Sequence, residues 1–492
     1  MTKLLNFIKN NKLEFSLLVT IILLGAIFRI YNINSSAHFG NDEGRDAVVV
    51  KNISEGKELP LLGPVAPNNR PDFHLGPVFY YLLTPFFALA NLDPVGGVYL
   101  VIIFALGALW LTYYLGKNLF NKWTGLLAAL LMSVNFLMVQ YSRWTWNPHP
   151  VPFFTLLIIL SLWKLIKGRD NYLILLAIAS GVIIQLHGTA LLVMPVFLFV
   201  FWLIFRPPIK NRVKLLIAIA CFIVVVSFLL IYDLQNNLAN SRGFLQVISQ
   251  SDSSASPSLW QQIDQNYFNF RNFWQQIILN NRLQFVGYLL GLAVLMLVGY
   301  RNYQTVIKKE KNFAWNVLAL WLLIPFLIFI FYKEAVPFHY FSLIYPLVFI
   351  ALAAMLVWLA KQKYFSLLTY LLIILLLGTN LYFITQFLLD SRYEGNRAHS
   401  HAIIIQEQRE AVDYIADQSG NEPFNFVSLP QNSYDKAYLY LLSLKNLEPS
   451  YQEEEISFVV LNPKSLTSEL ENDKIVESVD FGNVRVLTIN ND

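Results

Sequence analysis

The sequence predicts an all-α polytopic membrane protein, with about eleven transmembrane helices and additional juxtamembrane helices, that carries a small C-terminal α/β domain. Three observations support this fold class: the apolar composition, the repetition of long apolar stretches and the polar character of the C-terminal segment. Of the 492 residues, 56% are hydrophobic and only 14% are charged, and the mean hydropathy is +0.48. Soluble domains contain about 25% charged residues, so the composition favours a chain that lies largely in lipid.

The predicted spans are apolar stretches of roughly the 17 to 25 residues that a helix needs to cross the hydrocarbon core of a bilayer. The first of them, FSLLVTIILLGAIFRIY, follows a basic N-terminal segment. A cleaved signal peptide ending near Ser35-Ser36-Ala37 is the alternative interpretation, but many apolar runs follow and favour retention. The eleven predicted spans are residues 15–31, 95–116, 123–142, 150–167, 172–187, 190–205, 213–232, 284–300, 313–332, 337–360 and 365–388.

A further apolar run, PVFYYLLTPFFALANL at 77–92, is expected to lie in the interface or to re-enter the membrane instead of crossing it. The run is short and contains Pro77 and Pro85. If it does not cross, nearly every Lys and Arg cluster between the spans falls on one side, which the positive-inside rule identifies as the cytoplasm. This topology predicts a multi-pass protein of the plasma membrane, with its N-terminus in the cytoplasm and its C-terminus outside.

Three sizeable segments are then expected outside the membrane: residues 32–76, 233–283 and 389–492. The first two are outer loops of a transmembrane domain at 1–388, and 233–283 is expected to end in an interfacial helix rich in Trp and Phe. The third contains EQREAVDYIAD, which is typical of an amphipathic helix, and EISFVVLNP and NVRVLTIN, which are typical of strands. Residues 389–492 are therefore predicted to form an extracytoplasmic α/β domain.

The charge pattern argues against a nucleic-acid partner, and the cysteine content does not indicate a redox compartment. The net charge is +4, but the lysines and arginines are scattered between apolar runs instead of forming a basic face, so no nucleic-acid partner is expected. The single cysteine, Cys221, has no partner for an intrachain disulfide.

Polar and ionisable side chains gather at the outer ends of the predicted spans, whereas the middles of the spans contain almost none. Ion-coupled transporters usually need such groups at mid-membrane, so the pattern favours a cavity open to the outer leaflet. There, a carboxylate can accept a proton from an attacking hydroxyl, and cations can stabilise a phosphate leaving group. Tyr80, Tyr81, Trp144 and Trp146 are candidates for stacking on sugar rings.

Five motifs carry a resemblance to a known family: GNDEGRDA after the first span, HLGPVFYYLL, SRWTWNPHP, QLHGTALL and PFHYFSLIYP. Over roughly residues 1–388 the chain resembles the GT-C glycosyltransferases, in particular bacterial relatives of the dolichyl-phosphate-mannose protein mannosyltransferases and of the lipid A aminoarabinose transferase. The resemblance implies an enzyme that transfers a sugar from a polyprenyl-phosphate donor to a hydroxyl of a protein, lipid or glycan. Such transfer inverts the anomeric carbon and takes place on the extracytoplasmic face.

The resemblance also implies roles for residues that match its motifs. Asp42 is the expected general base, with Glu43 as its companion. The remaining candidates are Lys333, His339, Tyr340 and Arg143 for the donor phosphate, and His74, Tyr80, Asn147 and His187 for substrate. The chain departs from the aminoarabinose transferase where His74-Leu75 replaces an acid-lysine pair and where Asn147 replaces an acid.

Each candidate has a structural alternative. Asp42 and Glu43 can cap a helix that starts near Gly44, and Arg143 and Lys333 can anchor span ends at the interface. The histidines are more often hydrogen-bonded structural residues than metal ligands, and Tyr and Trp at span ends form an aromatic belt. No cofactor or metal site is expected from the spacing of the ligands; a divalent cation is left open because outward-facing carboxylates can bind one.

Two alternative functions stay open beside glycosyl transfer. A lipid or polysaccharide flippase would move a lipid-linked sugar without chemistry, and an inactive scaffold would only recruit partners through its outer domain. The donor sugar and the acceptor are not identified by the sequence.

Overall fold

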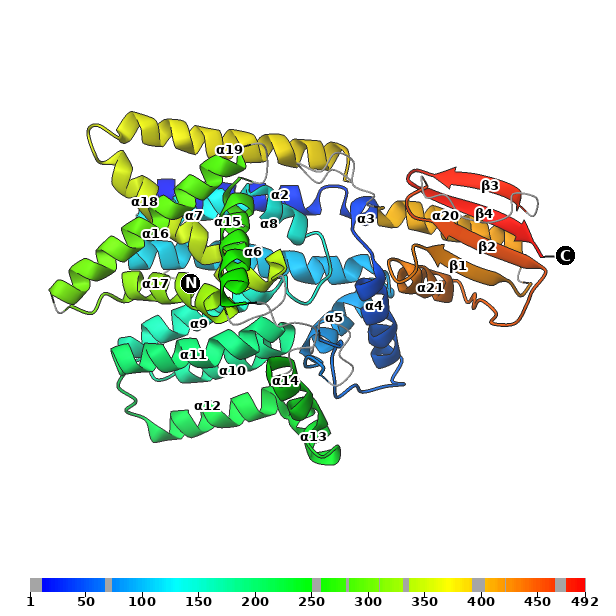
Figure 1. Ribbon diagram of the computed structural model, residues 1–492, viewed down its shortest axis with the longest axis horizontal. Coiled ribbons are helices and arrows are strands. Elements are labelled where there is room, and N and C mark those ends of the chain that lie inside the picture. Colours follow the sequence, from blue (N-terminus) through cyan, green and yellow to red (C-terminus); the bar gives the residue numbers. More distant parts are fainter. Residues whose placement is uncertain are drawn as a thin grey trace.

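The computed structural model describes residues 11–66, 73–249, 258–279, 283–308, 310–330, 336–391, 403–420, 422–464 and 475–491. The described chain is a bundle of helices with a four-stranded sheet at one end (Figure 1). This is the predicted fold class.

Every predicted span coincides with a helix or a pair of helices. Among the described residues, six helices are long and apolar enough to cross a membrane, and the pair α12 and α13, bent by 62°, adds a seventh if it forms one span. α9, α10 and α17 are shorter apolar helices, so the count of about eleven crossings stays a prediction. The elements are α2 (Lys12–Ile30), α6 (Val95–Leu119), α7 (Lys122–Ser133), α8 (Phe136–Tyr141), α9 (Val151–Ile166), α10 (Tyr172–Leu186), α11 (Gly188–Phe205), α12 (Arg212–Val225), α13 (Ser227–Gln235), α16 (Gln284–Ile307), α17 (Phe313–Phe329), η1 (Phe338–Ile344), α18 (Tyr345–Ala360) and α19 (Ser366–Leu389).

Three predicted spans are interrupted where polar side chains take over main-chain hydrogen bonds or the helix type changes. Between α7 and α8, the Asn135 side chain caps α8 by accepting from the Met138 amide at 3.1 Å. At the bend between α12 and α13, the Val225 carbonyl accepts from the Gln185 side chain at 2.8 Å. The third interruption is the change from the 3₁₀ helix η1 to α18.

Before the C-terminal unit, five further helices of the described chain lie outside the predicted spans: α3 (Ile33–Ser36), α4 (Asn41–Ser54), α5 (Val78–Leu89), α14 (Ala239–Ser249) and α15 (Leu259–Ile278). α5 is the apolar run that was not expected to cross. Its 12 residues span about 18 Å, which is shorter than the ~30 Å hydrocarbon core. α5 packs between α4, α6 and α10, and α15 is the predicted aromatic helix of the second outer loop.

The C-terminal unit is a small α/β fold built from α20 (Ile405–Ser419), β1 (Asn425–Leu429), α21 (Asp435–Leu444), β2 (Ile456–Leu461), β3 (Ile475–Phe481) and β4 (Val484–Asn490). The strand order is β1-β2-β4-β3, with β1 and β2 parallel and the other pairs antiparallel. The predicted helix and two strands correspond to α20, β2 and β4. The unit lies at the end of the bundle that also holds α3, α4 and α5, with α21 against α4 (Figure 1).

Candidate active site

The first turn of α4 holds Asp42 and Glu43, and their surroundings differ sharply. Glu43 Oε2 accepts from the Gly40 amide at 2.8 Å, which caps the helix where its dipole favours negative charge. The Asp42 side chain is 49% exposed, and its Oδ1 accepts from Arg45 Nη1 at 2.8 Å. The capping interpretation therefore explains Glu43, whereas Asp42 presents a carboxylate to the surroundings.

Glu43 is buried, at 3% exposure, and connects α4 to the loop after α8. Its Oε1 accepts from the indole Nε1 of Trp144. Burial raises the pKa of Glu43 to about 8. His38 Nε2 lies 3.9 Å from Glu43 Oε2, but burial lowers the pKa of His38 to about 4, so this contact is not an ion pair at neutral pH.

Arg45 holds a second carboxylate beside the first. Its Nη2 lies 2.7 Å from Oδ1 of Asp46, which is 1% exposed, and burial raises the pKa of Asp46 to about 6. Tyr80, a predicted substrate residue, lies close enough to influence Asp46 electrostatically. One guanidinium thus bridges Asp42 and Asp46, with Tyr80 nearby.

Aromatic and histidine side chains from distant segments meet next to Asp42. The Trp146 ring centroid lies 4.8 Å from that of Trp144 and 4.4 Å from that of His339. His187 lies 5.4 Å from His339 and 5.1 Å from Tyr340, centroid to centroid. The negative charge of Asp42 acts on His339, so Asp42 lies within electrostatic range of this cluster.

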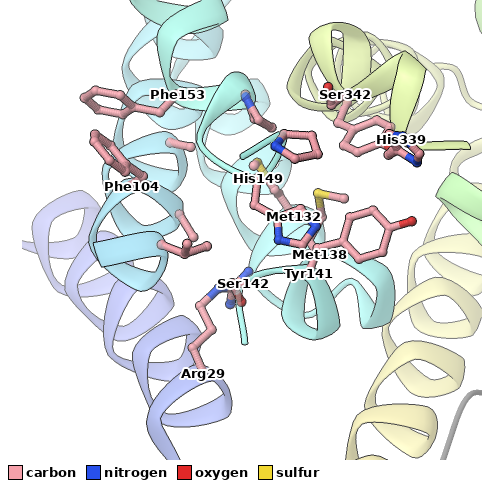
Figure 2. A pocket seen from close by; sticks show the side chains of 16 residues that line it. Arg29, Phe104, Met132, Met138, Tyr141, Ser142, His149, Phe153, His339 and Ser342 are labelled. Atoms are coloured by element: carbon pink, nitrogen blue, oxygen red, sulfur yellow. The ribbon is translucent and has the colours of Figure 1, made fainter. Parts of the chain in front are cut away.

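A small cavity adjoins this site and shares His339 with it. Its volume is about 30 Å³, enough for about two water molecules. Figure 2 shows Arg29, His149 and Ser342 among its lining residues. Arg29 Nε, His149 Nε2 and Ser342 Oγ are buried without a hydrogen-bond partner in the described part of the chain, so the cavity offers polar atoms inside an otherwise apolar lining.

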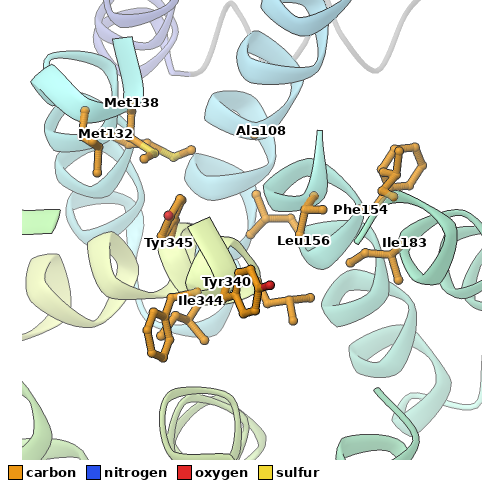
Figure 3. Close-up of a cluster of buried hydrophobic side chains, with 14 of the residues drawn as sticks. Ala108, Met132, Met138, Phe154, Leu156, Ile183, Tyr340, Ile344 and Tyr345 are labelled. Atoms are coloured by element: carbon orange, nitrogen blue, oxygen red, sulfur yellow. The ribbon is translucent and has the colours of Figure 1, made fainter. Parts of the chain in front are cut away.

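Buried hydrophobic packing fixes the η1 side of the site. Tyr340, Ile344 and Tyr345 lie in a cluster with Leu156 and Ile183, which come from α9 and α10 (Figure 3). Tyr345 also donates to the Phe338 carbonyl at 2.9 Å. Because close-packed side chains allow little movement, η1 presents His339 in one orientation.

Comparisons with known proteins agree with this architecture. Residues 70–232 match the family model described as dolichyl-phosphate-mannose-protein mannosyltransferase. The structure of ArnT from Cupriavidus metallidurans bound to undecaprenyl phosphate has 10% identity and a TM-score of 0.60, over 96% of this chain and 97% of that chain. The chain has the GT-C glycosyltransferase fold. The resemblance inferred from the five motifs is thereby confirmed.

Archaeal oligosaccharyltransferases share the GT-C fold with this chain. The Archaeoglobus fulgidus enzyme in complex with Zn and sulfate has 14% identity and a TM-score of 0.52, over 88% of this chain and 62% of that chain. AglB from the same organism, in complex with an inhibitory peptide and a dolichol-phosphate, has 13% identity and a TM-score of 0.52, over 92% of this chain and 70% of that chain. No curated protein matches the chain significantly.

Three of the predicted site residues form hydrogen bonds with main-chain carbonyls. Arg143 is 2% exposed and donates to the carbonyls of Phe28, Arg29 and Tyr31 at 3.2, 3.2 and 2.8 Å, which caps the end of α2. His74 Nδ1 lies 3.0 Å from the Gly63 carbonyl oxygen. Asn147 donates to the Leu186 carbonyl at 2.5 Å. Their roles in binding stay predictions, and Lys333 lies outside the described residues.

Some residues of this site were not among the sequence candidates. Arg45 and Asp46 stand in the same GNDEGRDA motif as Asp42, and their charge in an apolar chain was the available signal. His38 and His149 gave no such signal, since single histidines are usually structural. Within the described ranges, no three His, Cys, Asp or Glu side chains are grouped closely enough to hold a metal ion.

Proposed function

We propose that the protein is an integral membrane glycosyltransferase that transfers a sugar from a polyprenyl-phosphate donor to a hydroxyl acceptor on the extracytoplasmic face. The fold supports this, because ArnT carries undecaprenyl phosphate and AglB carries a dolichol-phosphate in the matching structures. The observation that carries the proposal is the exposed carboxylate of Asp42 beside the His187, His339 and Tyr340 cluster.

Asp42 is the base in this proposal. Its 49% exposed side chain can reach a substrate hydroxyl, whereas Glu43 and Asp46 are shut away from solvent at 3% and 1% exposure. Burial raises the pKa of both neighbours, to about 8 for Glu43 and about 6 for Asp46, so each holds its proton more strongly than an ordinary carboxyl group does. Arg45 fixes the position of Asp42 through the 2.8 Å hydrogen bond.

The reaction is a single displacement at the anomeric carbon. Asp42 accepts the proton of the acceptor hydroxyl as that oxygen forms a bond to the anomeric carbon from the face opposite the phosphate. The bond between the anomeric carbon and the phosphate oxygen breaks, and the polyprenyl phosphate leaves with the electron pair. The configuration therefore inverts. A cation near the phosphate stabilises its growing charge, and we assign this role to Lys333, with Arg143 as a second candidate. We assign His339 and Tyr340 to the same phosphate as hydrogen-bond donors.

The test is sugar transfer by purified wild-type protein and by the Asp42→Asn variant, with radiolabelled undecaprenyl-phosphate hexoses and pentoses as donors. We expect transfer to be lost in Asp42→Asn while donor binding persists. Asp413→Asn, an exposed aspartate paired with Lys445 in the C-terminal unit, is the matched control and should retain activity. Full activity of Asp42→Asn would refute the role of Asp42.

The same assay distinguishes the flippase alternative. Thin-layer separation of the donor lipid shows whether the sugar has left the phosphate. A flippase would leave the labelled donor intact under all conditions, and such a result with wild-type protein would contradict the proposed function.

A further inference from the structure

The C-terminal unit touches α4 at the turn that carries Asp42. Gly44 lies two residues after Asp42, and a Cβ atom at this position would lie 2.3 Å from the Ala437 amide nitrogen and from the Lys436 carbonyl carbon. Such distances exclude any side chain. α4 and α21 therefore meet backbone to backbone, which only glycine permits here.

Asn41 makes two hydrogen bonds to the start of α21, one as a donor and one as an acceptor. Its backbone amide donates to the Ser433 carbonyl at 3.1 Å, and its side-chain Oδ1 accepts from the Lys436 amide at 3.0 Å. The second bond satisfies one of the free amides at the N-terminal end of α21. Asn41 directly precedes Asp42, so the pair of bonds fixes the backbone next to the proposed base.

The C-terminal unit also holds the segment that leads into α4. The Ile405 amide donates to the Ala37 carbonyl at 3.0 Å, and the fully buried Gln408 donates to the Phe39 carbonyl at 2.9 Å. Arg409 forms a bidentate pair with Asp93 at 2.7 and 2.6 Å and donates to the Asn34 carbonyl. Several hydrogen bonds from this unit thus reach residues 34–41, directly before Asp42, and others reach Lys51, Leu92 and Asp93.

We propose that the C-terminal α/β unit is the positioning element of the active site, and that Asn41 is the positioning residue through which it holds Asp42. On the opposite side, Glu43 ties the same helical turn to Trp144 of the membrane domain. The turn is therefore held between the two parts of the chain. A base that moves by about 1 Å can lose about a hundredfold in rate, so loss of one of these holds slows the reaction without abolishing it.

This inference rests on the proposed function for the role of Asp42. The experiment compares Asn41→Ala, Asn41→Asp and Gly44→Ala with wild-type protein, in the full-length chain. We expect the Asn41→Ala change to lower kcat about tenfold and to leave KM for the polyprenyl-phosphate donor within about twofold. Asn41→Asp keeps the acceptor oxygen for the Lys436 amide and should restore most of kcat.

Asn491→Ala is the matched control. Its side chain donates to the Glu454 carbonyl and to Ser457, both within the C-terminal unit and away from α4. It should leave kcat unchanged. Gly44→Ala, which forces α4 and α21 apart, should lower kcat at least as much as Asn41→Ala.

Hydrogen–deuterium exchange of residues 37–46 gives a readout that does not depend on activity. Faster exchange of this peptide in Asn41→Ala and Gly44→Ala, but not in Asn491→Ala, supports the positioning role. Wild-type exchange in both variants would overturn it, as would wild-type kcat in both. If wild-type protein transfers no sugar, the proposed function fails, and the exchange result alone then decides whether the C-terminal unit holds the turn.

Discussion

Glu43 is expected to make the protein less stable as the pH rises. Burial raises the pKa of Glu43 from an ordinary value of 4.5 to about 8. In the interval between these values, the unfolded chain has lost the Glu43 proton while the folded chain keeps it, so a rise in pH favours the unfolded state. Each pKa unit corresponds to about 1.4 kcal/mol, which gives at most about 5 kcal/mol over the whole interval.

Between about pH 6.5 and pH 8, Glu43 alone is expected to lower the free energy of unfolding by about 2 kcal/mol. His38, whose pKa burial lowers to about 4, takes up a proton only in the unfolded state near pH 6.5 and so acts in the opposite direction, which is why the contribution of Glu43 is measured as the difference between wild type and Glu43→Gln. The assay is the midpoint of thermal unfolding in detergent across this window, for wild type, Glu43→Gln and the exposed control Glu58→Gln.

We expect the midpoints of wild type and Glu58→Gln to fall, relative to the midpoint of Glu43→Gln, as the pH rises. Glu43→Gln should slow sugar transfer without abolishing it, in contrast to Asp42→Asn, because Glu43 holds the turn through Trp144 and is not the base. Parallel pH curves for wild type and Glu43→Gln would refute the assignment of the raised pKa to Glu43.

Two further predictions concern Arg143 and the orientation in the membrane. Arg143→Met removes the hydrogen bonds to three carbonyls at the end of α2 and should lower the free energy of unfolding by about 3 kcal/mol, measured by thermal unfolding. A higher KM for the polyprenyl-phosphate sugar with an unchanged unfolding midpoint would instead favour phosphate binding by Arg143. In a Cys221→Ser background, a membrane-impermeant maleimide should label Glu58→Cys but not Arg169→Cys in intact cells, and the reverse pattern would invert the proposed topology.

The helices of the membrane domain could be predicted because their length and apolarity are properties of single segments. Each predicted span is largely helical, and most helix ends lie within a few residues of the predicted span ends. The interruptions could not be predicted in the same way. Asn135 ends a helix by capping the next one, and Gln185 binds the Val225 carbonyl from another helix, so both effects depend on contacts between segments.

The site could be predicted in part. The placement of polar groups at span ends brought out Asp42, His187 and His339, and the two histidines lie 5.4 Å apart, centroid to centroid. The resemblance already favoured Asp42 over Glu43 as the base, but the sequence could not reveal that the fold buries Glu43 and leaves Asp42 half exposed. Arg143 has the charge that a phosphate site needs, yet its guanidinium lies against main-chain carbonyls that the sequence does not reveal.

The backbone contact between the C-terminal unit and Gly44 has a consequence for how related sequences diverge. Lys436 and Ala437 offer only main-chain atoms at this contact, and main-chain atoms are the same in every residue. Substitutions along α21 therefore leave this backbone contact intact as long as position 44 stays without a side chain. The C-terminal unit can therefore acquire new surface side chains, whereas a single methyl group at position 44 of α4 would disturb its attachment.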